Sequence, residues 1–499
     1  MASVDWKVEP NHPLPRFEPI DRQQVVLEPL DIEQLIPEGH AARSIWELLG
    51  RLDLRRFVGE VKSVEGHAGR NLWEPRLLIA MWTYAYSRGI SSAREIERQC
   101  AYEPGLRWLT GLQVVNHHTL SDFRVEQGQA LQNLFVQVLG ILTLEKLATL
   151  ERVMVDGTKV RACVNKKTFS RAHKIREHLK LARQHVEQLQ REEAEQEKRG
   201  RKAAAQRRAA RERVERLEEA LVEVERLRAE KKEERDKPCQ ASTTDSDAQF
   251  MRTSDHGLAP AYNVQLTTDA RHKLIVDVEV SKQPSDSAHL LPALDRIKQQ
   301  RGAYPEQAVA DGDYTTREAV VGAAQREVDY YGSWTERGEE RQAHGIDPAY
   351  HASVFRYDQQ GNEMICPEGR RLGLKTIQKG PGGLKLFVYT ARREDCQQCE
   401  KRLLCTPQNA LNRHGRAVSV ALEPKAVERY HRKMATEAGK DIYKQRAPVA
   451  EFPHAWLKDK LKWVRTRSRG LLKVKAEALW VCLTYNFQRY FKLRQPQMA

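Results

Sequence analysis

The chain has 499 residues, of which 30% are charged and 40% hydrophobic, and its formal net charge at pH 7 is +15. A chain this long exceeds what one compact core usually holds, so we expect about two to four domains. No apolar run approaches the roughly 18 residues of a membrane span and the first residues lack a signal-peptide layout, so we expect a cytoplasmic protein with no membrane partner. The excess of Lys and Arg favours a polyanionic partner, with a merely basic soluble protein as the alternative.

The first part of the chain predicts a flexible arm followed by a helical domain. Residues 1–20 are rich in proline and polar side chains. Residues 21–140 show apolar residues at helical spacing, and Asn116 begins a segment typical of a capped helix start. Compact helices with basic turns are typical of a helix-turn-helix DNA-binding domain, in which the helix ending near Arg124 would approach a groove. A helical dimerisation domain is the alternative.

The middle of the chain predicts an α/β core. We expect a series of strands and helices in the order β-β-β-α-β-α-β, over residues 152–164, 261–268, 273–281, 288–300, a strand ending at Asp311, 315–325 and 328–332. A helix carrying Glu451 follows later in the chain. This is the order of a ribonuclease H-like core, with a mixed five-stranded sheet and flanking helices, formed by residues 150–332 and 426–495.

An insertion over residues 166–237 interrupts this core. It consists almost entirely of Lys, Arg, Glu, Gln and Ala, with apolar residues at heptad spacing in two arms of similar length. Because Gly200 lies between the arms, we predict an antiparallel coiled-coil hairpin. Its charge density suits DNA or a partner subunit, and a solvated coiled coil is the alternative.

A second insertion, over residues 333–425, is rich in cysteine. It contains Cys366, the pair Cys396-Gln-Gln-Cys399, and Cys405. Four thiolates at these loop-forming distances can hold a structural Zn²⁺ in tetrahedral geometry, with four free thiols as the alternative.

Three acidic residues are the strongest functional signal. Asp156 and Asp311 each end a short apolar run, and Glu451 stands near the start of an expected helix, since Pro453 is tolerated in a first helical turn. Such carboxylates can converge at one edge of a sheet and hold Mg²⁺ or Mn²⁺. Asp313, two residues after Asp311, would face the same way if the strand continued, but we favour Asp311 as the ligand.

These motifs together resemble bacterial insertion-sequence transposases of the DDE type, in the branch with a Tyr-Arg-Glu-Lys signature. The resemblance rests on Asp156-Gly-Thr, Ala310-Asp311-Gly-Asp-Tyr314, and the run from Tyr443 through Arg446 and Glu451 to Lys458. It also includes Thr244-Asp-Ser-Asp247, Ala261-Tyr-Asn-Val-Gln265, Glu477 and Asn486. Each piece is weak alone, but their shared order is specific. The family usually has Gly where this chain has Asp313.

The resemblance implies a mechanism and partners. Asp156, Asp311 and Glu451 would hold two Mg²⁺ ions for cleavage of DNA at terminal inverted repeats and joining of the 3′ ends to target DNA. Tyr443, Arg446 and Lys458 would grip DNA near the cut, with a core aromatic as the alternative for Tyr443. Double-stranded DNA and a homodimer on DNA are the expected partners, in a bacterial cytoplasm near the nucleoid.

Three other functions compete with this one. A metal-dependent nuclease would use the same acids without strand transfer. A domesticated transposase, or another non-catalytic DNA-binding protein, would have kept the motifs without the chemistry. A structural coiled-coil protein would explain residues 166–237 alone.

Overall fold

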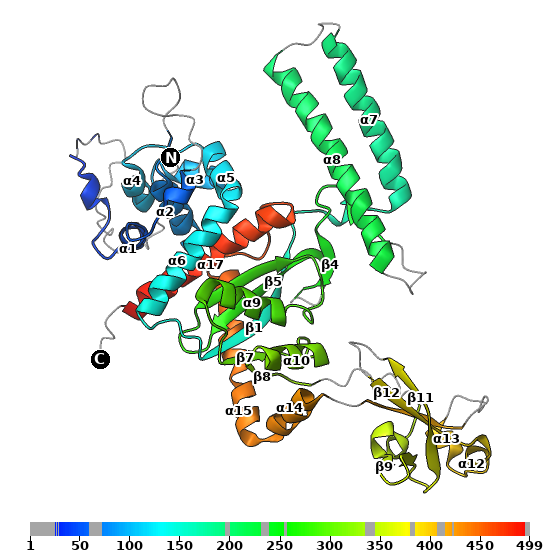
Figure 1. The fold of residues 1–499 in the computed structure, drawn as a ribbon. Coiled ribbons are helices and arrows are strands. Elements are labelled where there is room, and N and C mark those ends of the chain that lie inside the picture. Colours follow the sequence, from blue (N-terminus) through cyan, green and yellow to red (C-terminus); the bar gives the residue numbers. More distant parts are fainter. Residues whose placement is uncertain are drawn as a thin grey trace, which may run out of the picture.

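The computed structural model describes residues 29–58, 72–194, 200–230, 239–253, 257–334, 345–379, 385–406, 415–421 and 424–494, together with Val25 and Leu27. The predicted arm over residues 1–20 lies outside these described residues. Figure 1 shows a central body made of a sheet and the N-terminal helices. A helical hairpin and a smaller β-rich module project from this body in different directions.

The N-terminal region is helical, as its sequence predicts. Helix α2 is apolar on nearly every side and is therefore buried among its neighbours, with Trp82 and Tyr86 fully inaccessible. The predicted helix start is present, because the Asn116 side chain accepts a hydrogen bond from the backbone N–H of His118. The elements of this region are η1 (Ile32–Leu35), α1 (Ala41–Leu49), η2 (Arg55–Phe57), α2 (Pro75–Ser87), α3 (Ala93–Gln99), α4 (Pro104–Thr110), α5 (His117–Glu126) and α6 (Gly128–Leu144).

Strand β1 (Arg152–Arg161) lies at the centre of the main sheet. It runs antiparallel to β5 (Leu258–Asp269) on one side and parallel to β7 (Gln307–Ala310) on the other. Burial of β1 on both faces matches its apolar run, since Val153, Met154 and Val155 are all inaccessible.

The outer strands extend the sheet beyond the prediction. β8 (Asp329–Tyr331) pairs parallel with β7, and β6 (Ile275–Ser281) pairs antiparallel with β5. A short strand that the sequence does not predict, β4 (Gln249–Arg252), pairs with the beginning of β5. The described sheet therefore has six strands rather than five, because β5 is long enough to pair with β4 and β6 along the same edge.

Helices connect and cover this sheet. α9 (Leu290–Arg301) links β6 to β7, and α10 (Arg317–Gln325) links β7 to β8. α16 (Arg446–Asp459) packs on β1 and β5, and α17 (Leu471–Arg494) packs on β6 and on the N-terminal helices.

Asn486 explains how α17 is fixed to the edge of the sheet. Its side chain accepts a hydrogen bond from the Ile275 N–H at 2.9 Å and donates one to the Ile275 carbonyl at 2.8 Å. Two further helices, α14 (Lys425–Ala435) and α15 (Glu437–Lys444), precede α16.

The first insertion forms the predicted antiparallel hairpin of α7 (Ala172–Ala194) and α8 (Arg201–Glu230), which rises from the body in Figure 1. At its base, β2 (Phe169–Ser170) pairs with β3 (Ala241–Ser242), preceded by η3 (Lys166–Thr168). Glu223 is buried on α8 and accepts hydrogen bonds from Lys282 and Gln249 at 2.9 Å each, which anchors the hairpin to the central body.

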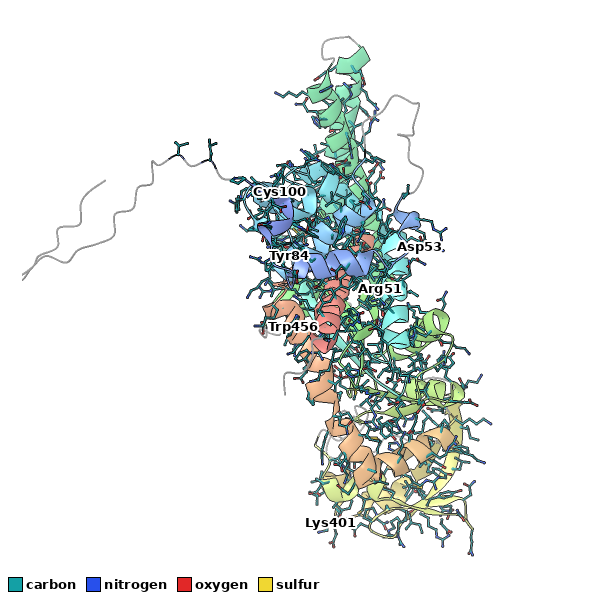
Figure 2. The ribbon with its side chains drawn as sticks, turned by 90° about the vertical axis from the view of Figure 1, so that its left-hand side faces the viewer. Arg51, Asp53, Tyr84, Cys100, Lys401 and Trp456 are labelled. Atoms are coloured by element: carbon teal, nitrogen blue, oxygen red, sulfur yellow. The ribbon has the colours of Figure 1, made fainter. Side chains whose placement is uncertain are left out.

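The second insertion forms a separate antiparallel sheet in the order β13-β12-β11-β10-β9. In Figure 2 its Lys401 lies at the end of the molecule opposite Cys100 of the N-terminal helices. Its elements are η4 (Pro348–Tyr350), η5 (Ala352–Val354), β9 (Arg356–Asp358), β10 (Glu363–Ile365), β11 (Arg371–Lys379), β12 (Lys385–Ala391), α12 (Arg393–Gln397), α13 (Arg402–Cys405) and β13 (Ala417–Ala421). Across the described parts of the chain, no helix combines the length and apolar character needed to cross a membrane.

Candidate active site

Two of the three predicted acids meet at one edge of the main sheet. Val155 pairs with Ala310 in the parallel ladder between β1 and β7. The next residues on the two strands are Asp156 and Asp311, and neighbouring strands lie about 4.8 Å apart. The structure thus brings these two carboxylates side by side at the point where β7 ends.

Asp156 lies beside two cationic or potentially cationic groups. Its Oδ2 is 3.8 Å from Arg446 Nη1 and 3.5 Å from His454 Nε2. Burial acts to raise the pKa of Asp156, but the hydrogen bond and charge of His454 and the charge of Arg446 outweigh it and hold the pKa below its usual value. Asp156 therefore carries a negative charge at neutral pH.

The pKa of Asp311 is shifted in the opposite direction, above its usual value. Burial raises the pKa of Asp311, and the negative charges of Asp156 and Asp286 raise it further, while Arg446 partly opposes them. The raised pKa reflects repulsion between carboxylates that the fold keeps close together. A bound cation would relieve that repulsion.

A hydrogen-bonded network lies next to this pair and is centred on Asp286. Its Oδ1 accepts hydrogen bonds from Lys159 Nζ at 2.9 Å, Asn263 Nδ2 at 2.6 Å and Gln265 Nε2 at 2.7 Å. The strand register explains the meeting, because Gly157 stands opposite Gln265 and Lys159 opposite Asn263. The Lys159 ammonium and the Asp286 carboxyl group thus form an ion pair inside the protein.

This network also contacts Gly157 and Tyr314, which belong to the motifs of Asp156 and Asp311. The Tyr314 hydroxyl donates to Gln265 Oε1, and burial together with the charges of Asp286, Asp156 and Asp311 raises the pKa of Tyr314 well above its usual value. Gly157 is needed beside the network, because a Cβ there would lie 2.6 Å from Gln265 Nε2 and 2.8 Å from Asp286 Oδ1. The residues after Asp156 and Asp311 therefore support the acids that precede them.

The structure does not join the third predicted acid to the pair. Glu451 is exposed on α16, one helical turn before His454, whose imidazole faces Asp156. The expectation that Glu451 opens a helix is wrong, because α16 begins at Arg446 and Pro453 lies inside it. Glu451 is thus a mid-helix residue close to the site but outside the Asp156–Asp311 contact.

The predicted DNA contacts around α16 differ in their surroundings. Arg446 is the one nearest the acids, with its side chain 19% exposed. Tyr443 is half-buried and packs against an apolar cluster that includes Met154, Val309 and Val449, so much of its ring belongs to the core. Lys458 is partly exposed near the end of α16.

Two other sequence interpretations need correction. Arg124 is buried, donates a hydrogen bond to the Ser91 carbonyl at 2.9 Å, and lies over the Trp82 ring, so its guanidinium serves packing rather than an exposed DNA contact. Asp313 does not continue the strand of Asp311, because β7 ends at Ala310. The chain turns there, and the Asp313 N–H donates to Asp311 Oδ1 at 2.8 Å.

The acids have the chemistry for a hard divalent cation. Within the described residues, no group of three or more His, Cys, Asp or Glu side chains is arranged to hold a metal ion as it stands. Asp156 and Asp311 nevertheless fit one, because they offer oxygen ligands whose mutual repulsion a cation would remove. The four predicted zinc ligands, Cys366, Cys396, Cys399 and Cys405, lie elsewhere and line one small cavity of the β-rich module.

Sequence reasoning missed three residues that shape the site. Asn263 was named only within a motif, although a polar residue alternating with apolar ones in a buried strand signals a network. The spacing of His454 could have indicated that it shares a helix face with two predicted site residues, since it lies three residues after Glu451 and four before Lys458. Asp286 stands in a polar loop whose sequence does not distinguish it from a surface turn.

Two parts of the chain match families of known proteins. A family described as "Transposase DDE domain" matches residues 365–491, and one described as "Transposase domain (DUF772)" matches residues 30–126. No curated protein matches the chain.

Among solved structures, the chain is similar to a piggyBac transposase in a synaptic complex with hairpin DNA, at 9% identity and a TM-score of 0.24. The alignment covers 92% of this chain and 82% of that chain, but so low a TM-score supports no conclusion about this protein. Two separate parts of the chain, one toward each end, are thus similar to transposase families.

Proposed function

We propose that this protein is a DDE transposase of an insertion sequence, which cuts DNA at the terminal inverted repeats of that element and joins the 3′ ends to target DNA. The observation that carries the proposal is the Asp156–Asp311 pair at the edge where β7 ends. Two half-buried carboxylates held together against their repulsion, with Arg446 beside them, suit chemistry on a phosphodiester.

We further propose that the catalytic core is ribonuclease H-like. The strand order β6-β5-β1-β7-β8 supports this, with β5 antiparallel to β1 and with β7 and β8 parallel to it. In this arrangement Asp156 lies on β1 and Asp311 directly follows β7. We propose that Glu451 on α16, from a later part of the chain, completes the set when metal and DNA are bound.

Different residues of the chain would hold the metal ions and contact the DNA. Asp156 and Asp311 would hold Mg²⁺ or Mn²⁺, with Glu451 as a further ligand from α16. A divalent cation of this kind activates the attacking oxygen and neutralises charge that develops on the phosphate. Arg446 supports the same phosphate as a charge-assisted donor, and Lys458 supports the strand farther along α16 as a point charge.

DNA is the proposed partner at more than one surface. The net charge of +15 favours binding to the phosphate backbone, and any exposed face of Tyr443 can stack on a displaced base. Recognition of the repeats is assigned to the N-terminal helices. A homodimer on DNA follows from the need to join two ends in one event.

The test is cleavage of a DNA fragment that ends in the inverted repeats flanking the coding region. Purified protein with Mg²⁺ or Mn²⁺ should nick the repeat boundary and yield joined products. Asp156→Asn, Asp311→Asn and Glu451→Gln should abolish both products. Asp313→Asn is the matched control and should keep them, because Asp313 is exposed and lies beyond the end of β7.

Each other outcome has a distinct meaning. Repeat binding without nicking in either metal would replace the proposal with a non-catalytic DNA-binding protein. Nicks without joined products would indicate a nuclease. Full activity of Glu451→Gln beside inactive Asp156→Asn would remove Glu451 from the site while keeping the pair.

A further inference from the structure

Four cysteines of the β-rich module surround one small cavity that the proposed function does not use. Cys366 follows β10, Cys396 lies in α12, Cys399 lies between the two short helices, and Cys405 ends α13. All four line the cavity, and all four are free thiols.

Backbone N–H groups point at two of these sulfur atoms. The Arg370 N–H donates to Cys366 Sγ at 3.2 Å, in a tight turn completed by a 2.9 Å hydrogen bond from the Gly369 N–H to the Cys366 carbonyl. Gly369 supplies the left-handed backbone that this turn needs, with φ of +75°.

Cys396 has the same kind of environment from another part of the chain. The Arg416 N–H donates to its Sγ at 3.3 Å. The preceding Gly415 allows this approach, because a Cβ there would lie 2.7 Å from the sulfur. The backbone thus wraps closely around sulfur atoms on two separate elements.

Cationic side chains complete the surroundings. Arg370, Arg402 and Arg416 line the cavity together with the cysteines. The buried Nε atoms of Arg402 and Arg416 have no hydrogen-bond partner among the described residues. Buried donors without acceptors are costly, and thiolates in this cavity would supply the missing negative charge.

The apolar core of the module meets the short helices through two of the cysteines, since Cys396 of α12 and Cys405 of α13 pack against it. Among the described residues, the buried members of this cluster are Phe355, Met364, Leu372, Tyr389, Ala391 and Val418. α12 has five residues and α13 has four, far below the roughly 12 to 15 at which an isolated helix becomes even marginally stable. Leu403 and Leu404 of α13 are 72% and 44% exposed, so burial of these side chains does not anchor the helix.

We propose that Cys366, Cys396, Cys399 and Cys405 bind one structural Zn²⁺ as thiolates. Four zinc–sulfur bonds of about 2.3 Å would tie α12 and α13 to the turn between β10 and β11. Since the sulfurs do not yet form a metal-binding group, binding draws them inward. The turn and the short helices can make this movement while the sheet stays in place.

The test uses the full-length protein purified without chelator, with bound metal measured by plasma emission. One zinc per chain is expected, falling to background in each of the variants Cys366→Ser, Cys396→Ser, Cys399→Ser and Cys405→Ser. Cys163→Ser is the matched control, because Cys163 is a partly exposed thiol outside the module, and it should retain the zinc. Asp156→Asn should also retain it, which separates this site from the proposed catalytic one.

A second readout keeps the proposal testable if the serine variants fold poorly. Replacing zinc by Co²⁺ in the wild-type chain should give the absorption of tetrahedral cobalt with sulfur-to-metal charge transfer. A wild-type protein without zinc that gives no such spectrum after Co²⁺ addition would overturn the proposal. So would well-folded serine variants that keep the full zinc content.

Discussion

Replacing Gly157 by alanine tests whether the network beside the acids sets their geometry. The new Cβ would lie 2.6 Å from Gln265 Nε2 and 2.8 Å from Asp286 Oδ1, whereas ordinary contacts of a Cβ begin near 3.4 Å. Both atoms must move, and they are hydrogen-bonded to each other at 2.7 Å. Overpacking of this kind costs about 1–3 kcal/mol, and loss of a hydrogen bond to a charged group costs roughly 1.5–3 kcal/mol.

The effect on catalysis should exceed the effect on stability. Gly157 is adjacent to Asp156, and Gln265 holds Tyr314 beside Asp311, so the displacement reaches both acids. Misplacement of reacting groups by about 1 Å can lower a rate by about 10²-fold. We therefore expect roughly that loss of nicking at saturating Mg²⁺.

Thermal unfolding and the nicking assay, run on the same preparations, check this prediction. Gly140→Ala in α6 is the control, because a Cβ there meets nothing within 4 Å and alanine is favoured in a helix. It should melt at or slightly above the wild-type temperature and nick normally. If Gly157→Ala also shows wild-type nicking and melting, the network does not position the acids.

Three further predictions concern charge and packing. The pKa of Asp311 is raised in the folded state, so the folding stability that protonation of Asp311 contributes is present below the unfolded pKa of about 4 and is lost as pH rises through the folded pKa. Asp311→Asn should therefore raise the metal-free melting temperature at pH 7 but not at pH 3. Glu477→Ala should destabilise the protein by about 3 kcal/mol or more, measured by denaturant unfolding, since buried N–H groups of Trp463, Arg467 and Ser468 lose their acceptor. Arg124→Met should lower stability by about 1–3 kcal/mol and leave repeat binding unchanged in a gel-shift assay; weaker binding by a normally stable variant would restore Arg124 as a DNA contact.

The sequence could predict the main elements because their signals are local. The apolar runs before Asp156 and Asp311 correspond to β1 and β7, and the heptad arms around Gly200 correspond to the helical hairpin. Strand β4 was missed because Gln249–Arg252 is too short to show a period, and it forms only where the long β5 offers a free edge.

The site was predictable only in part because its contacts join distant segments. Asp286 meets Lys159 across 127 positions of the chain, and no local pattern marks that pairing. Pro453 misled the prediction for Glu451, because tertiary packing of α16 on β1 and β5 tolerates a proline in the helix interior. Arg124 has the composition of a DNA contact, but its position over Trp82 depends on the packing of whole helices.

The acidic motifs of this chain separate into two classes once their oxygen atoms are examined. Asp245 accepts from the Tyr262 hydroxyl at 2.7 Å and from the Gly470 N–H at 3.2 Å, and Asp247 accepts from the Leu471 N–H at 2.9 Å. These two acids therefore hold the start of α17 against the segment before β4. Their motif is acidic like those of Asp156 and Asp311, but its hydrogen bonds serve the fold.

Asp156 and Asp311 are held differently among the described residues. Each accepts a hydrogen bond from a local backbone N–H, Asp156 lies 3.5 Å or more from Arg446 and His454, and the pKa of Asp311 is raised by burial and by its acidic neighbours. His454 and Arg446 favour the charge of Asp156, whereas burial and the acidic neighbours make the charge of Asp311 unfavourable, which is a loss of stability. The fold nevertheless holds Asp156 and Asp311 together at one edge of the sheet, next to the Asp286 network. This arrangement costs stability in the free protein and leaves two carboxylates that can bind a cation.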